Sequence, residues 1–389
     1  MTRGALNNIR IVDLSWVVAG PMATKMLAGM GAEVIKIESS LRPEFTNRGH
    51  MFPALNNSKR SVSINLTTEE GRALIRDLVR ISDIVVENFS GRVLSKYGLD
   101  YESMRRIKPD LIYVSASGVG RTGPQKEMLA YGTLLQAYSG RASLLGEPNP
   151  RLERMGILPA WTDPVTAFWE ILAILSALAH RQVTSEGAYI DQSMLESTVS
   201  LLPESLLNEA LGGTGDITTG NHELDAAPSG CFPCGGDDQW LALSVRSDDE
   251  WQQFCALIDR RDLAEDPAFR TKDGRCAARA ELDRIAADWL QDKDANVAES
   301  LLMRSGIFAA RSRNILDLLA DPLIASRDVF PRVSPSRRTI GMPWMEGGKR
   351  PGDFTESPAL GADNDYVLQE ILGLSQPKID DLISRGIVK

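Results

Sequence analysis

An aspartate stands directly before the most apolar stretch of this 389-residue chain. Asp163 precedes Pro164, and proline favours the first position of a helix while disfavouring helical backbone in the residue before it. Asp163 is therefore expected to cap a helix that runs from Pro164 to Arg181. The positive end of that helix would keep the carboxylate ionised. Such a carboxylate has the chemistry of a nucleophile toward an acyl group, although helix capping alone also explains its position.

The cysteines, histidines and serines of the sequence show no complete metal-binding or catalytic motif. Cys231 and Cys234 form a lone Cys-x-x-Cys pair, and a zinc site needs two further ligands at usable spacing, so we expect no metal. The three histidines, His50, His180 and His222, form no pair four residues apart. No Gly-x-Ser-x-Gly turn is present to carry a serine nucleophile.

The glycine content near the N-terminus does not indicate a dinucleotide site. A Gly-x-Gly-x-x-Gly turn should join the first strand to its helix. The corresponding turn here is Trp16-Val17-Val18-Ala19-Gly20-Pro21, with a single glycine.

Strand and helix signals alternate along the first 120 residues or so. Strands are expected at 9–14, 32–38, 61–66, 83–89 and 111–115, and helices at 21–30 and 68–81. Further helices are expected at 133–143, 164–181 and 194–211, with a strand at 189–191. This alternation predicts an α/β fold with a Rossmann-like parallel sheet and helices on both faces.

A glycine- and threonine-rich segment at 211–221 separates this region from a different pattern. We expect a large domain at 1–220, a smaller α+β domain at 225–330, and a linker with C-terminal helices at 331–389 that returns to the large domain.

Composition and charge restrict the class of protein. A net charge of −9 makes nucleic acid a poor partner. Four cysteines and no recognisable signal peptide favour a cytoplasmic protein. The apolar stretch from Val165 to Ala179 contains Glu170 and is too short to span a bilayer, so we expect a buried helix and no membrane partner.

Five sequence blocks, in order, resemble the class III CoA-transferase family, which includes formyl-CoA and carnitine CoA-transferases. They are spread across residues 9 to 196, about half of the chain. The blocks are Leu14 to Pro21 with Gly31 to Glu38, Asn57 to Val62, Asp83 to Phe89, Ser117 to Pro124, and His180 to Glu196. Each block is weak alone, but five in register form a specific signal.

The resemblance implies an activity and a nucleophile. Such enzymes move CoA from an acyl-CoA, for example succinyl-CoA, to a small carboxylic acid. Asp163 falls on the family's aspartate, which would form a mixed anhydride and then an aspartyl-CoA thioester. Coenzyme A is the implied cofactor, bound as the acyl-CoA substrate, and no metal is needed.

The resemblance also implies binding residues. Contacts with CoA would come from Val18, Ala19, Arg42, Lys59, Asn88, Phe89 and Lys96, and the acceptor pocket would include Trp16 and Tyr131. Several positions depart from the family pattern, so that formyl or oxalyl specificity does not carry over. They include Ser39, for which Arg42 substitutes, together with Leu129, Gly132 and Ala167.

Family members form interlocked homodimers, and we expect the same here. The segment 211–221 is either a lid over the intermediate or a plain linker.

Two alternative functions stay open: an α-methylacyl-CoA racemase of the same fold, and a non-catalytic subunit of a heteromeric transferase. The racemase has a histidine where this chain has Tyr131, and no histidine lies between Gly118 and Gly140.

Overall fold

The computed structural model describes residues 4–39, 41, 48, 50–89, 91, 93–144, 160–213 and 220–389. Arg42 and most of the predicted lid, 214–219, lie outside the described residues. The chain divides into two compact units. The first comprises Met1–Ala142, Ile157–Glu204 and Pro322–Lys389, and the second comprises Ser143–Gly156 and Ser205–Asp321.

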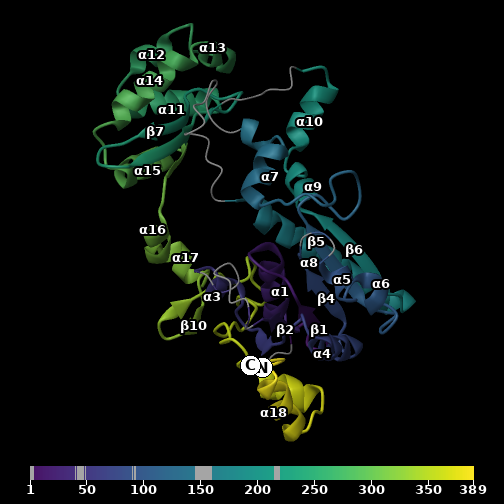
Figure 1. Cartoon of the computed structure of the whole chain (residues 1–389). Coiled ribbons are helices and arrows are strands. Elements are labelled where there is room, and N and C mark those ends of the chain that lie inside the picture. The colour runs from purple at the N-terminus through teal and green to yellow at the C-terminus, as the bar shows by residue number, and fades with distance from the viewer. Residues whose placement is uncertain are drawn as a thin grey trace. The chain divides into compact units, whose positions relative to one another are not determined.

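A six-stranded sheet with the order β3-β2-β1-β4-β5-β6 forms the centre of the first unit (Figure 1). All neighbouring strands in it are parallel. The strands are β1 (Arg10–Asp13), β2 (Glu33–Glu38), β3 (Arg60–Ser63), β4 (Ile84–Glu87), β5 (Ile112–Ser117) and β6 (Ala188–Ser193). The predicted α/β fold with a parallel sheet is confirmed.

The sheet has an apolar core on each face because successive side chains of a strand point to opposite sides. In β1, Ile11 belongs to the core with α1 (Ala19–Gly29) and α8 (Thr162–Thr184). Val12 belongs to the other core, which includes side chains of α4 (Glu69–Arg80) and α18 (Gln376–Ser384). Both faces of the central strands are thus buried, as is typical of a parallel sheet.

The chain also forms shorter helical segments. They are α3 (Phe52–Leu55), α5 (Val93–Lys96), α6 (Tyr101–Met104), α7 (Gly132–Tyr138), a 3-10 turn (Arg141–Leu144), α9 (Met194–Val199), α10 (Pro203–Ala210), α17 (Pro322–Ser326) and a π-helix (Tyr366–Ile371). A two-stranded ribbon of β10 (Arg332–Ser334) and β11 (Arg337–Arg338) lies in the returning segment.

Two predicted helix starts were wrong. Helix α1 begins at Ala19 rather than Pro21, and α8 begins at Thr162, so that Asp163 lies in the first turn and Trp161 is the N-cap residue. Proline is tolerated throughout a first turn because the amides there have no intrahelical acceptor. The single helix expected at 194–211 is divided into α9 and α10, with Pro203 at the start of the latter.

Helix α8 has 23 residues and, in the described part of the chain, is the one helix long and apolar enough to cross a membrane by length and composition. The argument that this stretch is too short was therefore wrong. The core helix of a soluble protein passes the same test. Ala167, Ile171, Ile174 and Leu178 of α8 do lie in the core against the sheet.

The second unit is a smaller α+β structure. Its antiparallel sheet has the order β7-β8-β9, formed by β7 (Ser229–Pro233), β8 (Trp240–Ser244) and β9 (Phe308–Arg311). Trp251 and Phe254 are fully buried in its core. Its helices are α11 (Asp248–Leu257), α12 (Arg261–Glu265), α13 (Lys272–Ala277), α14 (Arg279–Leu290), α15 (Ala295–Arg304) and α16 (Ile315–Ala320).

Candidate active site

The strand order reverses between β1 and β4, and five of the predicted site residues lie at this point. Ligands of open parallel sheets bind outside the carboxyl ends of the strands where the order reverses. Trp16, Val18 and Ala19 follow β1, and Asn88 and Phe89 follow β4. The structure therefore brings together residues that are about 70 positions apart in the sequence.

The Asn88 side chain joins the loop after β4 to the loop after β1 by two hydrogen bonds. Its Oδ1 accepts the Trp16 N–H at 2.7 Å, and its Nδ2 donates to the Trp16 carbonyl at 2.7 Å. The rings of Trp16 and Phe89 have centroids 5.3 Å apart. Val17 has a φ of 64°, a left-handed conformation that is costly for a β-branched residue. The turn into α1 is thus held by these contacts against its local preference.

The first turn of α1 begins directly after the loop that contains Trp16 and Val17. Val18 is the N-cap residue and makes no side-chain cap, and the first turn contains no acidic residue. Amide groups at such a helix start attract anions. This geometry fits the predicted backbone contacts of Val18 and Ala19 with CoA.

Asp163 lies beside the start of α7. Its carboxylate packs so closely on Gly132 that a Cβ atom there would collide with Asp163 Oδ2. Thr162 fixes the two helix starts, because its Oγ1 donates to the Gly132 carbonyl at 3.1 Å. Tyr131, the N-cap residue of α7, is exposed next to them.

The pKa of Asp163 is raised rather than lowered. Burial raises the pKa of its carboxyl to about 6, and a backbone hydrogen bond only partly opposes this. The position near the start of α8 was expected to keep the group ionised, and at this pKa the carboxyl is still mostly ionised near pH 7. Desolvation outweighs the helix dipole because the side chain is partly buried.

A buried cluster of charges lies behind the β1 loop. Asp13 Oδ2 accepts from Lys59 Nζ at 2.8 Å and lies 3.9 Å from Lys36 Nζ. Burial alone would raise the pKa of Asp13, but Lys36, Lys59 and hydrogen bonds hold it well below its usual range. Burial lowers the pKa of Lys59 to about 7, opposed by the charge of Asp13.

Lys59 therefore does not present its ammonium to a phosphate in this structure. Its Nζ also donates to the Pro21 carbonyl at 3.0 Å and to Asn56 Oδ1 at 2.8 Å, and its side chain is fully buried. A phosphate contact would require these bonds to break. The geometry instead gives Lys59 a role in holding the loop before α1.

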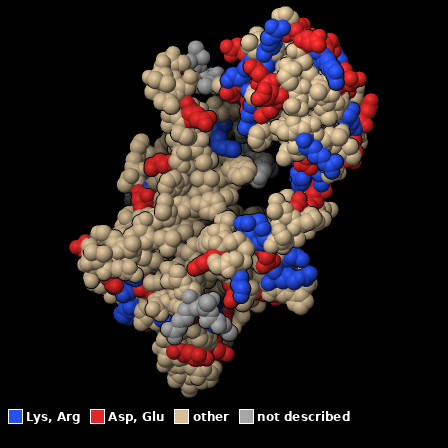
Figure 2. All heavy atoms as spheres, turned by 180° about the vertical axis from the view of Figure 1, so that it is seen from behind, with Lys and Arg blue, Asp and Glu red and all other residues tan. Residues whose placement is uncertain are grey.

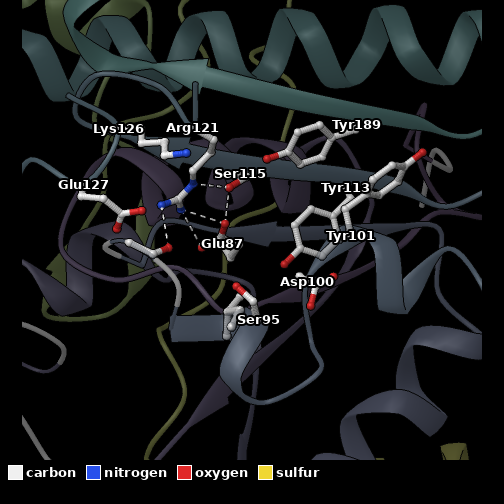
Figure 3. Close-up of a pocket in the computed structure, with 12 residues that line it drawn as sticks. Glu87, Ser95, Asp100, Tyr101, Tyr113, Ser115, Arg121, Lys126, Glu127 and Tyr189 are labelled. Carbon is white, nitrogen blue, oxygen red and sulfur yellow. Dashed lines mark hydrogen bonds and ion pairs between the residues drawn. The ribbon is translucent and has the colours of Figure 1, made fainter. Parts of the chain in front are cut away.

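A second buried ion pair lies at the end of β4 (Figure 3). Arg121 donates to both carboxylate oxygens of Glu87, at 2.9 and 3.1 Å. These two residues line a cavity of about 220 Å³ together with Ser115, Tyr101 and Tyr189. Burial raises the pKa of Glu87, and the charge of Arg121 opposes the shift.

Glu170 is the most unusual acid of α8. It is fully buried, and neither carboxylate oxygen has a hydrogen-bond partner among the described residues. Burial, with the charges of Asp13 and Glu87, raises its pKa to about 8. A group in this environment is protonated and neutral near pH 7.

Comparison with known proteins identifies the family. A sequence model described as "CoA-transferase family III" matches residues 6–364, nearly the whole chain. The chain belongs to CoA-transferase family III. The prediction of an enzyme of this class is confirmed.

Relatives and solved structures agree with the assignment to family III. The succinate–glutarate CoA-transferase of Agrobacterium fabrum is 33% identical, covering 94% of this chain and 95% of its own. The succinyl-CoA–D-citramalate CoA-transferase of Chloroflexus aurantiacus is 30% identical, covering 98% of each chain. The crystal structure of a CaiB/BaiF family protein from Brucella suis has a TM-score of 0.87 at 29% identity, covering 95% of this chain and 100% of that chain.

Family III enzymes use CoA thioesters. Two further residues were predicted to bind CoA, Lys96 and Arg42. Lys96 ends α5 and is exposed, so its ammonium is accessible. Arg42 lies outside the described residues. No group of three His, Cys, Asp or Glu suited to a metal ion occurs among the residues that the structure describes.

Sequence reasoning did not single out the buried acids Asp13, Glu87 and Glu170. Asp13 and Glu87 each follow buried apolar residues at the end of a strand, and Glu170 interrupts an apolar helix. A charged residue at a position whose neighbours are buried is the signal that could have identified them. The pairing of Asp13 with Lys59 and of Glu87 with Arg121 depends on tertiary structure and leaves no such signal.

Proposed function

We propose that this chain transfers CoA from an acyl-CoA to a small carboxylic acid, with Asp163 as the nucleophile. The observation that carries the proposal is the partly buried Asp163 carboxylate, which packs on Gly132 at the junction of α7 and α8. Its pKa of about 6 leaves it mostly anionic near pH 7 yet poorly solvated, which suits attack on a thioester.

The reaction proceeds in balanced steps. An Asp163 oxygen attacks the thioester carbonyl and the carbon–sulfur bond breaks, so that CoA leaves as the thiolate and a mixed anhydride forms on Asp163. The thiolate then attacks the aspartyl carbonyl, which releases the donor acid and forms an aspartyl-CoA thioester. The acceptor carboxylate attacks that thioester, which releases the CoA thiolate again and forms a second mixed anhydride. The thiolate attacks the acceptor carbonyl of this anhydride, which gives the new acyl-CoA and frees the Asp163 carboxylate.

The names of the relatives indicate the substrate class. The relatives from Agrobacterium fabrum and Chloroflexus aurantiacus are named for succinate with glutarate, and for succinyl-CoA with citramalate. A relative from Haloarcula hispanica, 32% identical, is named a succinyl-CoA:mesaconate CoA-transferase. Succinyl-CoA is therefore the first donor to test, with small dicarboxylic acids as acceptors.

A CoA-exchange assay with two Asp163 variants tests the proposal. Asp163→Ala and Asp163→Asn should lose exchange between succinyl-CoA and a dicarboxylic acid by at least about a thousandfold while still binding CoA. The control Asp237→Ala alters an exposed aspartate of the second unit and should keep full exchange. Full exchange by either Asp163 variant would refute the mechanism.

The same proposal includes a homodimer. Helix α8 exposes Phe168, Trp169 and Leu172, each between 43% and 52% accessible. Figure 2 shows charged side chains crowding the second unit and broad uncharged areas on the first. Exposed apolar side chains of this size are typical of a surface covered by a partner.

Light scattering coupled to gel filtration tests this part. The wild-type chain should have twice the monomer mass of 42.6 kDa, and Leu172→Glu should shift it toward the monomer. A wild-type mass equal to the monomer at all concentrations would exclude the dimer.

A further inference from the structure

Arg121 makes an unusual number of contacts for a residue of a surface loop (Figure 3). Besides its two bonds to Glu87, it donates to the Ser115 hydroxyl at 2.7 Å and to the Phe89 carbonyl at 2.7 Å. A longer contact of 3.4 Å reaches the Gly91 carbonyl. The guanidinium thus holds the backbone that follows β4, on the side facing β5.

The backbone of Arg121 is itself anchored to a different strand. Its N–H donates to Asp191 Oδ1 on β6 at 2.8 Å. Close by, the Leu195 N–H donates to the Gly118 carbonyl at 2.9 Å. The loop that carries Arg121 is therefore fixed to β6, while its side chain holds the turn after β4.

Glu87 completes the arrangement from within the turn. Its Oε2 accepts the Phe89 N–H at 2.9 Å, and Ser115 donates to its other oxygen. The Glu87 side chain is 5% exposed and that of Arg121 14% exposed, so the pair is largely shielded from solvent. Both contacts with Glu87 come from one nitrogen of Arg121, Nη2, and such charge-assisted hydrogen bonds are stronger than neutral ones.

We propose that Arg121 is a positioning residue for CoA, which it serves by fixing the turn that carries Asn88 and Phe89. Through Asn88 the effect reaches Trp16 and the start of α1, because the Asn88 amide bonds both backbone groups of Trp16. This inference rests on the proposed function, since it assumes that CoA binds at this loop.

An arginine is required for this task. All three guanidinium nitrogens are used: Nε donates to the Ser115 hydroxyl, Nη1 to the Gly91 carbonyl, and Nη2 to Glu87 and the Phe89 carbonyl. The single nitrogen of lysine cannot take all three positions at once. A glutamine lacks both the reach and the charge that balances Glu87. Substitution should therefore loosen the turn without touching the Asp163 carboxylate.

The test measures CoA binding and steady-state kinetics of Arg121→Gln and Arg121→Lys. For Arg121→Gln, the dissociation constant for CoA and the KM for the acyl-CoA should both rise about tenfold. The KM for the acceptor acid and kcat should change far less. Arg121→Lys keeps the charge beside Glu87, should fold in any case, and should show a smaller rise in the same two constants.

Arg105→Gln is the matched control. Arg105 forms an exposed ion pair with Glu102 on α6, with side chains 53% and 61% accessible, and its loss should leave all four constants unchanged. An increase of both KM values by the same factor in Arg121→Gln would indicate general loosening and overturn the positioning role.

Calorimetry separates this inference from the proposed function. Wild-type protein that binds CoA, together with Arg121 variants that bind it equally well, would overturn the positioning role alone. Wild-type protein that binds no CoA would overturn both.

Discussion

Two acids on α8, Asp163 and Glu170, both have raised pKa values but differ in their ionisation near neutral pH. Asp163 stands at the helix start, is partly exposed, and has a pKa of about 6. Glu170 lies two turns further along, is fully buried, and has a pKa of about 8. Partial burial leaves Asp163 a reactive anion near neutral pH, whereas full burial leaves Glu170 a neutral acid.

The pKa of Asp163 predicts an acid limb in the rate. The carboxylate is the nucleophile, and protonation below about pH 6 removes it, so kcat/KM for the acyl-CoA should fall tenfold per pH unit below that value. A profile of kcat/KM between about pH 5 and about pH 8 checks this, because kcat/KM reports the ionisation of the free enzyme. A flat profile across that range would contradict the role of an ionising carboxyl with this pKa.

The burial of Glu170 predicts a pH dependence of stability. Its pKa rises from an ordinary 4.5 to about 8 on folding, so the folded state holds a proton that the unfolded state releases. As the pH rises from 4.5 to about 8, the free energy of unfolding should therefore fall by about 1.4 kcal/mol per pH unit. The stability associated with protonated Glu170 is fully present only below the unfolded-state pKa of 4.5.

Glu170→Gln should remove this slope, because an amide does not titrate. Urea unfolding at several pH values measures it, with Glu186→Gln as the control, since Glu186 is exposed just beyond the same helix. Equal slopes in the wild-type protein and Glu170→Gln would show that Glu170 is ionised in the folded state.

At the scale of elements, the junction of α7 and α8 sets the geometry of Asp163. Thr162 Oγ1 bonds the Gly132 carbonyl, and Thr198 Oγ1 in turn donates to Thr162 Oγ1 at 3.1 Å. The absence of a side chain at Gly132 leaves the space that the carboxylate occupies.

Gly132→Ala should therefore displace the Asp163 carboxylate. Gly132 has no positive φ, so alanine brings no backbone strain, and its methyl group collides chiefly with Asp163 Oδ2. We expect kcat to fall about ten- to a hundredfold with CoA binding retained. Thr133→Ala, one residue on, is the control. An active Gly132→Ala enzyme would mean that the carboxylate does not work from this position.

The elements were largely predictable, and their starts and polar partners were not. The apolar runs of β1, β2, β4 and β5 and the cap at Thr68 of α4 follow from local sequence. The start of α8 does not, because Pro164 is acceptable at any position of the first turn. The burial of Lys59 was missed because its partner, Asp13, lies 46 residues away.

At the scale of the whole molecule, the end of the chain completes the first unit. Val367, Leu368, Ile379 and Leu382 are buried in the same core as α4 and the sheet. Ile64 pairs with Val388 near the last residue. The site at β1 and β4 is therefore supported by a segment that follows the second unit in the sequence.

Leu382→Ala tests this support. Leu382 is 1% exposed, and its truncation should lower the free energy of unfolding by about 2–5 kcal/mol. The neighbouring Ile383 is 46% exposed, so Ile383→Ala should cost far less. Urea denaturation of both variants checks the difference, and similar losses would place the last helix outside the core.

The central claim is that a covalent intermediate forms on Asp163. Mass spectrometry of proteolytic fragments, after incubation with succinyl-CoA and trapping with hydroxylamine, tests it most directly. The account predicts a hydroxamate on the peptide that contains Asp163, and none when succinyl-CoA is omitted. An active enzyme whose trapped adduct lies on another residue, or that forms no adduct at all, would contradict it.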